Sequence, residues 1–187
     1  LVLVAATGTN NIDLPAARAH GVTVCNSQAY GTPSVAQHTL LLLLALATRL
    51  SDYQQAVRNG AWQQASQFCL LDFPIMELQD KTLGILGHGE LGGAVARLAE
   101  AFGMRVLGHD PKVPGVALDV LLAESDYVVI AAPHTPSTAG LFDRATIRKM
   151  KRTAVLINVG RGAIVRLDDL TAALEAWAEG QNELYPS

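Results

Sequence analysis

Apolar residues occur along the chain in two patterns, short continuous runs and longer segments with helical spacing. The continuous runs at 1–5, 82–86, 127–131 and 154–159 are typical of strands that are covered on both faces, as in a parallel sheet. In 91–102 the apolar residues recur at 91, 94, 95, 98 and 102, which is the period of a helix. Strands that alternate with helices in this way predict an α/β fold with a doubly wound parallel sheet.

The same patterns predict the other elements. They are helices at 14–19, 118–124, 145–150 and 170–178, and strands at 22–25 and 105–108. A long apolar helix is expected from Thr32 to Arg49, because Thr32 can cap free backbone N–H groups and Pro33 suits the first helical position. Its leucine run is far shorter than the roughly 20 apolar residues that span a membrane, so we expect a buried helix. Residues 59–80 show no period and predict a connection.

Composition narrows the classes of protein. Half of the residues are apolar, 17% are charged and the net charge is −3, which fits a soluble globular protein and gives no basic surface for nucleic acid. The two cysteines, Cys25 and Cys69, have neither metal-ligand spacing nor a disulfide pattern. We therefore expect a cytoplasmic protein without a metal site and without a membrane or nucleic-acid partner.

Three glycines in the stretch GILGHGELGG have the spacing G-x-G-x-x-G. A predicted strand precedes them and a predicted helix follows, as in dinucleotide-binding sites. In such a site Gly87 permits the tight turn, Gly89 lets the backbone approach a pyrophosphate, and Gly92 lets the helix pack closely on the strand. The N–H groups of Glu90 and Leu91 would then face the phosphates.

An acidic residue follows at the distance expected of a ribose-binding group. Asp110 comes 18 residues after Gly92, at the end of a predicted strand. Its carboxylate can accept hydrogen bonds from both adenosine ribose hydroxyls and would repel a 2′-phosphate, which favours NAD over NADP. Lys112 could instead reach a phosphate. A glycine-rich turn without a ligand and an S-adenosylmethionine-binding methyltransferase are the alternatives at this point.

A second polar cluster follows the strand predicted at 154–159. The stretch INVGRG places Asn158 and Arg161 at the carboxyl end of that strand. In an open α/β sheet, ligands bind at this edge. The alternative interpretation is that Arg161 is a loop arginine that pairs with a surface acid.

Together with the segments NNIDL at 10–14, GVTVCNS at 21–27 and VAQHT at 35–39, these motifs resemble the D-isomer-specific 2-hydroxyacid dehydrogenases, above all the hydroxypyruvate reductase and glycerate dehydrogenase branch. The resemblance extends from Leu1 to about Ala176. It implies that 27–187 is a Rossmann-type NAD-binding domain and that 1–26 is the end of a flavodoxin-like substrate-binding domain. It also implies hydride transfer between NAD(H) and a small 2-hydroxy or 2-keto acid, such as glycerate and hydroxypyruvate, or glyoxylate. The alternative is a non-catalytic NAD-binding regulatory module, while the Arg-Gly motif disfavours a methyltransferase.

The resemblance also implies roles for individual residues. Arg161 would be the catalytic arginine that binds the substrate carboxylate and polarises the keto oxygen, a task suited to a forked, always charged group. The backbone of Ala6, Thr7 and Gly8 would contact the substrate carboxylate or the nicotinamide side of the cofactor. The loop from Pro133 to Thr138 would flank the cofactor, and Val159 and Gly160 would lie under the nicotinamide.

The chain departs from its family after Arg161. The family's acid/base is a histidine steadied by a glutamate, both well downstream of the Arg-Gly motif, whereas every histidine here precedes it: His20, His38, His88, His109 and His134. We expect these histidines to be solvated or hydrogen-bonded, with His134 the least implausible substitute, and the chain as written to be a poor catalyst. Arg166 replaces the usual acidic or amide residue after the motif, and residues 181–187 lack the family pattern, so we expect truncation at both ends.

One further expectation concerns assembly. The predicted helix from Thr32 to Arg49 is apolar on nearly every side, which is more than one packing face requires. The family resemblance points the same way. We therefore expect a homodimer that buries part of this helix.

Overall fold

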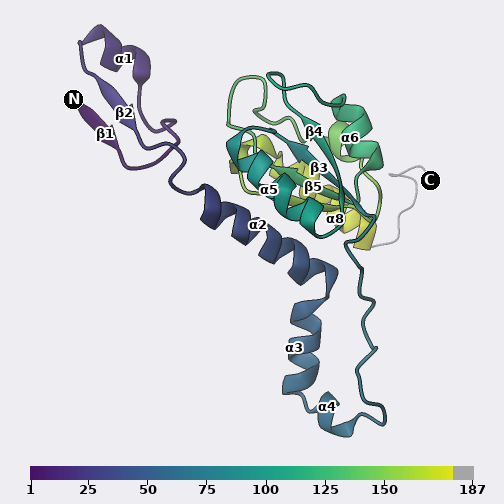
Figure 1. Ribbon diagram of the computed structural model, residues 1–187. Helices are drawn as coiled ribbons and strands as arrows, with labels where there is room; N and C mark the ends of the chain where they lie inside the picture. The colour runs from purple at the N-terminus through teal and green to yellow at the C-terminus, as the bar shows by residue number, and fades with distance from the viewer. Residues whose placement is uncertain (179–187) are drawn as a thin grey trace.

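The computed structural model describes residues 1–178 and contains two parallel sheets (Figure 1). The first sheet pairs β1 (Val2–Val4) with β2 (Val24–Asn26). The second has the order β4-β3-β5-β6. Its strands are β3 (Thr82–Leu86), β4 (Arg105–His109), β5 (Tyr127–Ile130) and β6 (Val155–Asn158). All pairings are parallel, as the apolar runs predict.

The four-stranded sheet has a core on each face, because successive strand residues point to opposite sides. On one face Leu83, Ile85 and Val129 pack against α2 (Thr32–Ala47) and α5 (Glu90–Ala101). On the other face the strands pack against helices α6 (Leu118–Glu124), α7 (Arg144–Ile147) and α8 (Leu167–Ala178), and against the 3-10 turn η1 (Gly162–Ile164). The predicted doubly wound α/β fold is confirmed.

The N-terminal sheet is small and its strands are joined by α1 (Leu14–Ala19). The carboxylate of Asp13 caps this helix by accepting a hydrogen bond from the Ala16 N–H at 2.9 Å. The prediction that the first strand is covered on both faces is wrong for the described chain, because Leu1 and Leu3 are 79% and 73% exposed. A sheet of two strands offers too little surface to cover them.

The long apolar helix differs from its prediction in two ways. It ends at Ala47, and Arg49 adopts a left-handed conformation with φ of 53°, from which a separate helix α3 (Leu50–Arg58) begins. Only one face of α2 is buried, through Ala36, Leu40 and Leu43, while Leu41 and Leu46 are about half exposed. The helices predicted from the sequence do not include α3.

The segment from 59 to 80 is mostly an irregular connection, as predicted, apart from the single turn α4 (Ala61–Gln64). In Figure 1, α3 and α4 extend away from the four-stranded sheet, and the chain returns from them in an extended strap. Within residues 1–178 no individual helix has the length and hydropathy to cross a membrane; α2 and α3 meet that test only as a pair, and they are bent by 62° relative to each other.

Candidate functional site

The glycine-rich loop joins β3 to α5, and two of its glycines are required by the packing of the chain itself. Gly87 has φ of +90°, a conformation that favours glycine, and a Cβ there would lie 2.6 Å from the backbone N of Ala132. A Cβ on Gly92 would collide with the carbonyl oxygen of Gly87. The tight turn and the close packing of α5 on this turn therefore both depend on glycine.

The third glycine of the motif has a different environment. A Cβ on Gly89 would meet no heavy atom within 4 Å, so nothing in the described chain explains why this position lacks a side chain. Gly89 is the N-cap of α5, and no side chain caps that helix end. The first N–H groups of a helix have no partner within the helix, so those of Glu90 and Leu91 lie beside open space. This combination fits an approaching phosphate group.

The side chain of Glu90 points to another element. Its Oε1 accepts a hydrogen bond of 2.9 Å from the hydroxyl of Thr32, at the start of α2. The prediction that the Thr32 hydroxyl caps its own helix is therefore wrong, since Gly31 is the N-cap of α2 and makes no side-chain bond. Thr32 is already the first helical residue, so its hydroxyl is not at the capping position. Any phosphate contact by Glu90 would come from its backbone N–H.

Asp110 directly follows β4, and the parallel register pairs the last residue of β4, His109, with Leu86 at the end of β3. The Asp110 carboxylate is half-buried, and its Oδ1 accepts a hydrogen bond of 2.8 Å from the backbone N–H of Lys112. The carboxylate therefore lies at the same sheet edge as the glycine loop. The side chain of Lys112 is exposed beside it.

The histidines near this edge differ from one another. The ring of His109 is hydrogen-bonded through Nδ1 to the carbonyl oxygen of Val116 at 2.8 Å, as expected. His134 is exposed. For His88 the expectation of a solvated or hydrogen-bonded ring is only partly met, because its Nδ1 is buried without a hydrogen-bond partner. That ring packs over Gly108, where a Cβ would lie 2.7 Å from Nδ1.

Arg161 lies just beyond the carboxyl end of β6 and is exposed. Its Nη1 donates to the carbonyl oxygen of Gly160 at 3.1 Å, and its Nε approaches Asn10 Oδ1 at 3.5 Å. A Cβ on Gly8 would collide with Nη2 of the same guanidinium. The fold therefore brings Arg161 against a loop that lies about 150 residues earlier in the sequence. A loop arginine whose role is to pair with a surface acid would not need this contact.

The N-terminal loop that faces Arg161 is held by the end of β2. Asn26 Nδ2 donates to the carbonyl oxygen of Thr7 at 2.7 Å, and the N–H of Ser27 donates to Ala6 at 3.2 Å. Asn10 and Asn26 were not selected in the sequence analysis. For Asn26 a signal was present, since it ends a short apolar strand as Asn158 does, whereas Asn10 lies in the loop after β1.

The ends of β5 and β6 meet in the same region. The N–H of Val159 donates to Ile130 at 3.0 Å, and a Cβ on Gly160 would lie 2.7 Å from the carbonyl oxygen of Ala132. Next to them, the Thr138 hydroxyl closes the loop from 133 to 138 by donating to the carbonyl oxygen of Pro133 at 2.7 Å. The carboxyl ends of all four strands of the larger sheet therefore carry the predicted site residues.

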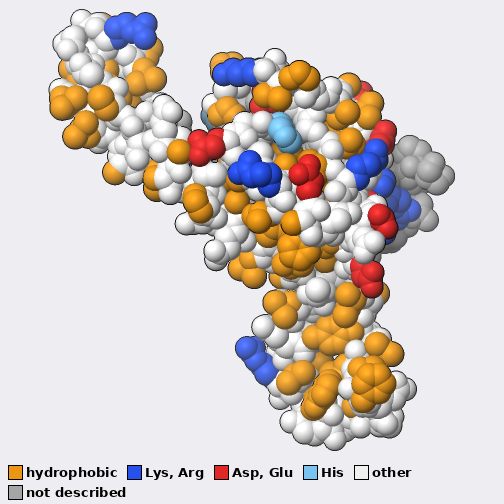
Figure 2. Space-filling model, viewed as in Figure 1, with side chains coloured by type: hydrophobic (Ala, Val, Ile, Leu, Met, Phe, Trp, Pro, Cys, Tyr) orange, Lys and Arg blue, Asp and Glu red, His pale blue; other side chains and the backbone are white. Residues whose placement is uncertain are grey.

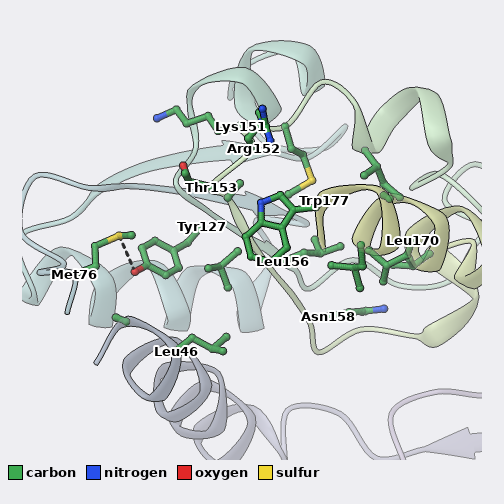
Figure 3. A pocket seen from close by; sticks show the side chains of 18 of the residues that line it. Leu46, Met76, Tyr127, Lys151, Arg152, Thr153, Leu156, Asn158, Leu170 and Trp177 are labelled. Carbon is green, nitrogen blue, oxygen red and sulfur yellow. Dashed lines mark hydrogen bonds between the residues drawn. The ribbon is translucent and has the colours of Figure 1, made fainter. Parts of the chain in front are cut away.

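A cavity of about 1350 Å³ lies elsewhere, on the open side of β6 (Figure 3). Its lining is mainly apolar and includes Leu46, Tyr127, Leu156, Leu170 and Trp177. Asn158 and Gly162 line it, so it adjoins the loop that carries Arg161, but neither Arg161 nor any residue of the glycine loop does. Among residues 1–178 there is no group of three or more His, Cys, Asp or Glu side chains that could hold a metal ion.

Comparison with known proteins supports a dehydrogenase assignment for this geometry. Residues 40–180 match the family described as D-isomer specific 2-hydroxyacid dehydrogenase, NAD binding domain. The chain is 41% identical over 182 residues to a glycerate dehydrogenase of Methylorubrum extorquens, covering 96% of this chain and 57% of the relative. It is 36% identical to a hydroxypyruvate reductase of Blautia hydrogenotrophica, covering 92% of this chain and 56% of the relative.

A solved structure agrees with these relatives. The D-lactate dehydrogenase of Aquifex aeolicus, in complex with NAD and lactic acid, superposes with a TM-score of 0.85 at 33% identity, covering 94% of this chain and 54% of that one. The chain thus spans somewhat more than half the length of the proteins it matches. It belongs to the D-isomer-specific 2-hydroxyacid dehydrogenase family and contains that family's NAD-binding domain.

Proposed function

We propose that this protein is an NAD-dependent oxidoreductase that transfers a hydride between NAD(H) and a small 2-hydroxy or 2-keto acid. The observation that carries the proposal is the placement of Arg161, whose guanidinium lies against Gly8 at the same sheet edge as the glycine loop. A permanent cation beside a loop of exposed or half-buried backbone suits an anionic substrate. The glycine loop, which follows β3 at the same sheet edge, suits the nucleotide.

The residues present fit NAD. The open space at Gly89 and the free N–H groups of Glu90 and Leu91 would accept the pyrophosphate, and Asp110 would bind the adenosine ribose. On the nicotinamide side, the flanking residues would be Thr7, Pro133, Thr138, Val159 and Gly160. When bound, the nicotinamide supplies or accepts the hydride, while the protein aligns the reactants and excludes water.

Arg161 would hold the substrate carboxylate and polarise its keto oxygen. Its guanidinium presents donors in a rigid fork, so one side chain can bind a carboxylate in a fixed orientation. The polarised carbonyl carbon then accepts a hydride more readily. The proton that the oxygen takes up would come from the histidine that the family resemblance expects downstream of Arg161. The backbone of Ala6, Thr7 and Gly8, in the N-terminal loop that lies against Arg161, would contact the same carboxylate.

For the substrate, we infer glycerate and hydroxypyruvate, or glyoxylate. The names of the two relatives given above, a glycerate dehydrogenase and a hydroxypyruvate reductase, support glycerate and hydroxypyruvate. We also propose the division into 1–26 as part of a substrate-binding domain and 27–187 as the NAD-binding domain. The separate two-stranded sheet at the N-terminus supports that division. Two free thiols, one exposed and one half-buried, support a reducing, cytoplasmic setting.

A homodimer is part of the proposal. Exposed apolar side chains lie along α2 and α3 and in the connection after them, among them Leu41, Leu46, Val57, Trp62 and Phe68. Figure 2 shows hydrophobic side chains gathered over the part of the molecule formed by α3 and α4. The apolar surface of α2, α3 and the connection after them, here called the apolar arm, is costly to expose to water. A second copy of the chain would cover it.

The direct test is NADH oxidation by the polypeptide as its gene encodes it, with hydroxypyruvate, glyoxylate and pyruvate as substrates. We expect turnover with the first two and formation of the D-isomer from hydroxypyruvate. Tight NADH binding without oxidation by any 2-keto acid would contradict the proposal. That result would favour the alternative, a regulatory NAD-binding module.

A further inference from the structure

Asn158 occupies a distinctive place at the last position of β6. Its Oδ1 accepts a hydrogen bond of 3.0 Å from the N–H of Gly160, and its Nδ2 donates to the carbonyl oxygen of Arg161, also at 3.0 Å. A side-chain amide presents a neutral donor and an acceptor close together on one planar group, which suits two backbone partners that lie near each other. The two bonds therefore fix the backbone on both sides of the Gly160–Arg161 peptide.

β6, the strand that ends at Asn158, is paired with the fully buried strand β5. Asn158 pairs in register with Ile130 of β5, whose side chain is fully buried. The next residue, Val159, donates its N–H to the carbonyl oxygen of Ile130 at 3.0 Å. The Asn158 amide thus transmits the position of the sheet to the loop that carries Arg161.

The segment after Arg161 is held by other contacts. The N–H of Phe142 donates to the carbonyl oxygen of Ile164 at 3.0 Å, and the N–H of Gly140 donates to Ala163 at 2.8 Å. Phe142 and Ile164 are fully buried. The carbonyl oxygen of Arg161 also accepts from the N–H of Ile164 at 3.1 Å, so loss of the amide would leave this carbonyl hydrogen-bonded. Removing Asn158 should therefore loosen the loop without unfolding its surroundings.

We propose that Asn158 is a positioning residue that aims the Arg161 guanidinium at the substrate carboxylate. Few other contacts fix the guanidinium within residues 1–178: it bonds to its own neighbour Gly160, approaches Asn10 at 3.5 Å and lies against Gly8. A freer backbone would let its fork sample directions that do not match a carboxylate. This inference rests on the role proposed above for Arg161.

The expected kinetic signature is specific. In Asn158→Ala, kcat/KM for the 2-keto acid should fall by about ten- to one-hundredfold, with KM raised, because small displacements of a positioning group are costly. The Kd of NADH should change much less, by under about threefold, since the pyrophosphate and the ribose would be held at the ends of β3 and β4 and only the nicotinamide would lie beside Gly160. Asp143→Ala is the control, because it removes one side-chain bond to the Thr146 N–H at the start of α7 and should leave the kinetics unchanged.

A double-mutant cycle tests whether Asn158 acts through Arg161. Asn158→Ala, Arg161→Ala and the double variant are compared by kcat/KM in the polypeptide as its gene encodes it. We expect Asn158→Ala to change kcat/KM by less than about twofold once Arg161 is alanine. If Asn158→Ala does not fold, Asn158→Asp serves, since it keeps the acceptor for Gly160 and loses the donor to Arg161.

The outcomes separate the two proposals. An equal loss in both backgrounds, or no loss in the wild-type background, overturns the positioning role while leaving Arg161 as the substrate-binding residue. No effect of Arg161→Ala itself overturns the proposed function and this inference with it.

Discussion

At the scale of single residues, Asp110 governs the choice of cofactor. A carboxylate that faces a 2′-phosphate loses its two ribose hydrogen bonds and gains repulsion, so NADH should bind at least about tenfold more tightly than NADPH, or about 1.4 kcal/mol. Calorimetry with both nucleotides measures this directly. Lys112→Ala is the control and should leave the ratio unchanged. Equal or reversed affinities would indicate that Lys112 binds the phosphate.

The glycines of the loop allow a second residue-level test. Gly89→Ala places a methyl group in space that the chain leaves open, so any loss of stability should come only from the weaker helix capping by alanine, about 1 kcal/mol or less. The affinity for NADH should nevertheless fall by about tenfold or more, because the methyl group would occupy the approach of the pyrophosphate. Gly93→Ala is the matched control in the same helix, where the nearest atom to a Cβ is Arg97 Nη1 at 3.8 Å. It should bind NADH normally and gain about 0.5–1 kcal/mol of stability. Wild-type binding by Gly89→Ala would show that the loop is only a turn.

The site itself was only partly predictable from residues. Gly87, Gly92 and Asp110 could be found because strand, turn and acid follow one another at short range. Gly8 and Arg161 were placed by family resemblance, since no local pattern specifies a contact across 150 residues. The amide of Asn10 was missed because an asparagine in a loop is more often a turn residue, and that of Asn26 because its partner, the Thr7 carbonyl oxygen, is distant in sequence.

At the scale of elements, Asp126 links the starts of three strands. Burial alone would raise its pKa, but hydrogen bonds from Lys151 Nζ and the Thr82 N–H, with the charges of Lys151 and Lys81, hold the pKa below its usual 3.8. A carboxyl whose pKa is lowered on folding stabilises the protein above its unfolded pKa, and that stability is lost as pH falls through the folded pKa. Asp126→Asn should therefore cost about 1 kcal/mol at pH 7 and progressively less below pH 4.

Chemical denaturation at several pH values measures this difference. Asp119→Asn is the control, because its ion pair with Lys149 is largely exposed and should contribute little. A cost for Asp126→Asn that does not change with pH would show that the ionised carboxylate is not the source of the stability.

Elements with a short-range signal were predictable and those fixed by tertiary contacts were not. The buried strands of the larger sheet follow from continuous apolar runs, and their parallel order follows from the alternation with helices. The start of α3 was missed because it depends on the left-handed conformation of Arg49, a residue with no special tendency to adopt it. The Thr32 hydroxyl was misassigned because its acceptor, Glu90, is distant in sequence.

At the scale of the whole molecule, the exposed apolar arm predicts a dimer. Light scattering of the folded protein at micromolar concentration should give twice the mass of the chain. Leu41→Lys should shift the protein toward the monomer, because it places a charge on the exposed face of α2. Val120→Lys, on α6 across the sheet from α2, should not. A wild-type protein that stays monomeric would count against the proposed interface.

The most direct test of the central claim is the effect of Arg161 on catalysis, measured with the polypeptide as its gene encodes it. Arg161→Ala should lower kcat/KM for the 2-keto acid by several hundredfold or more, because loss of a charge-assisted, forked contact in a closed site costs about 3 kcal/mol or above. The Kd of NADH should stay nearly constant, and Arg161→Lys should restore little, since a point charge cannot reproduce the fork. A melting curve recorded on the same samples excludes loss of fold. Unchanged kcat/KM in folded Arg161→Ala would contradict the account.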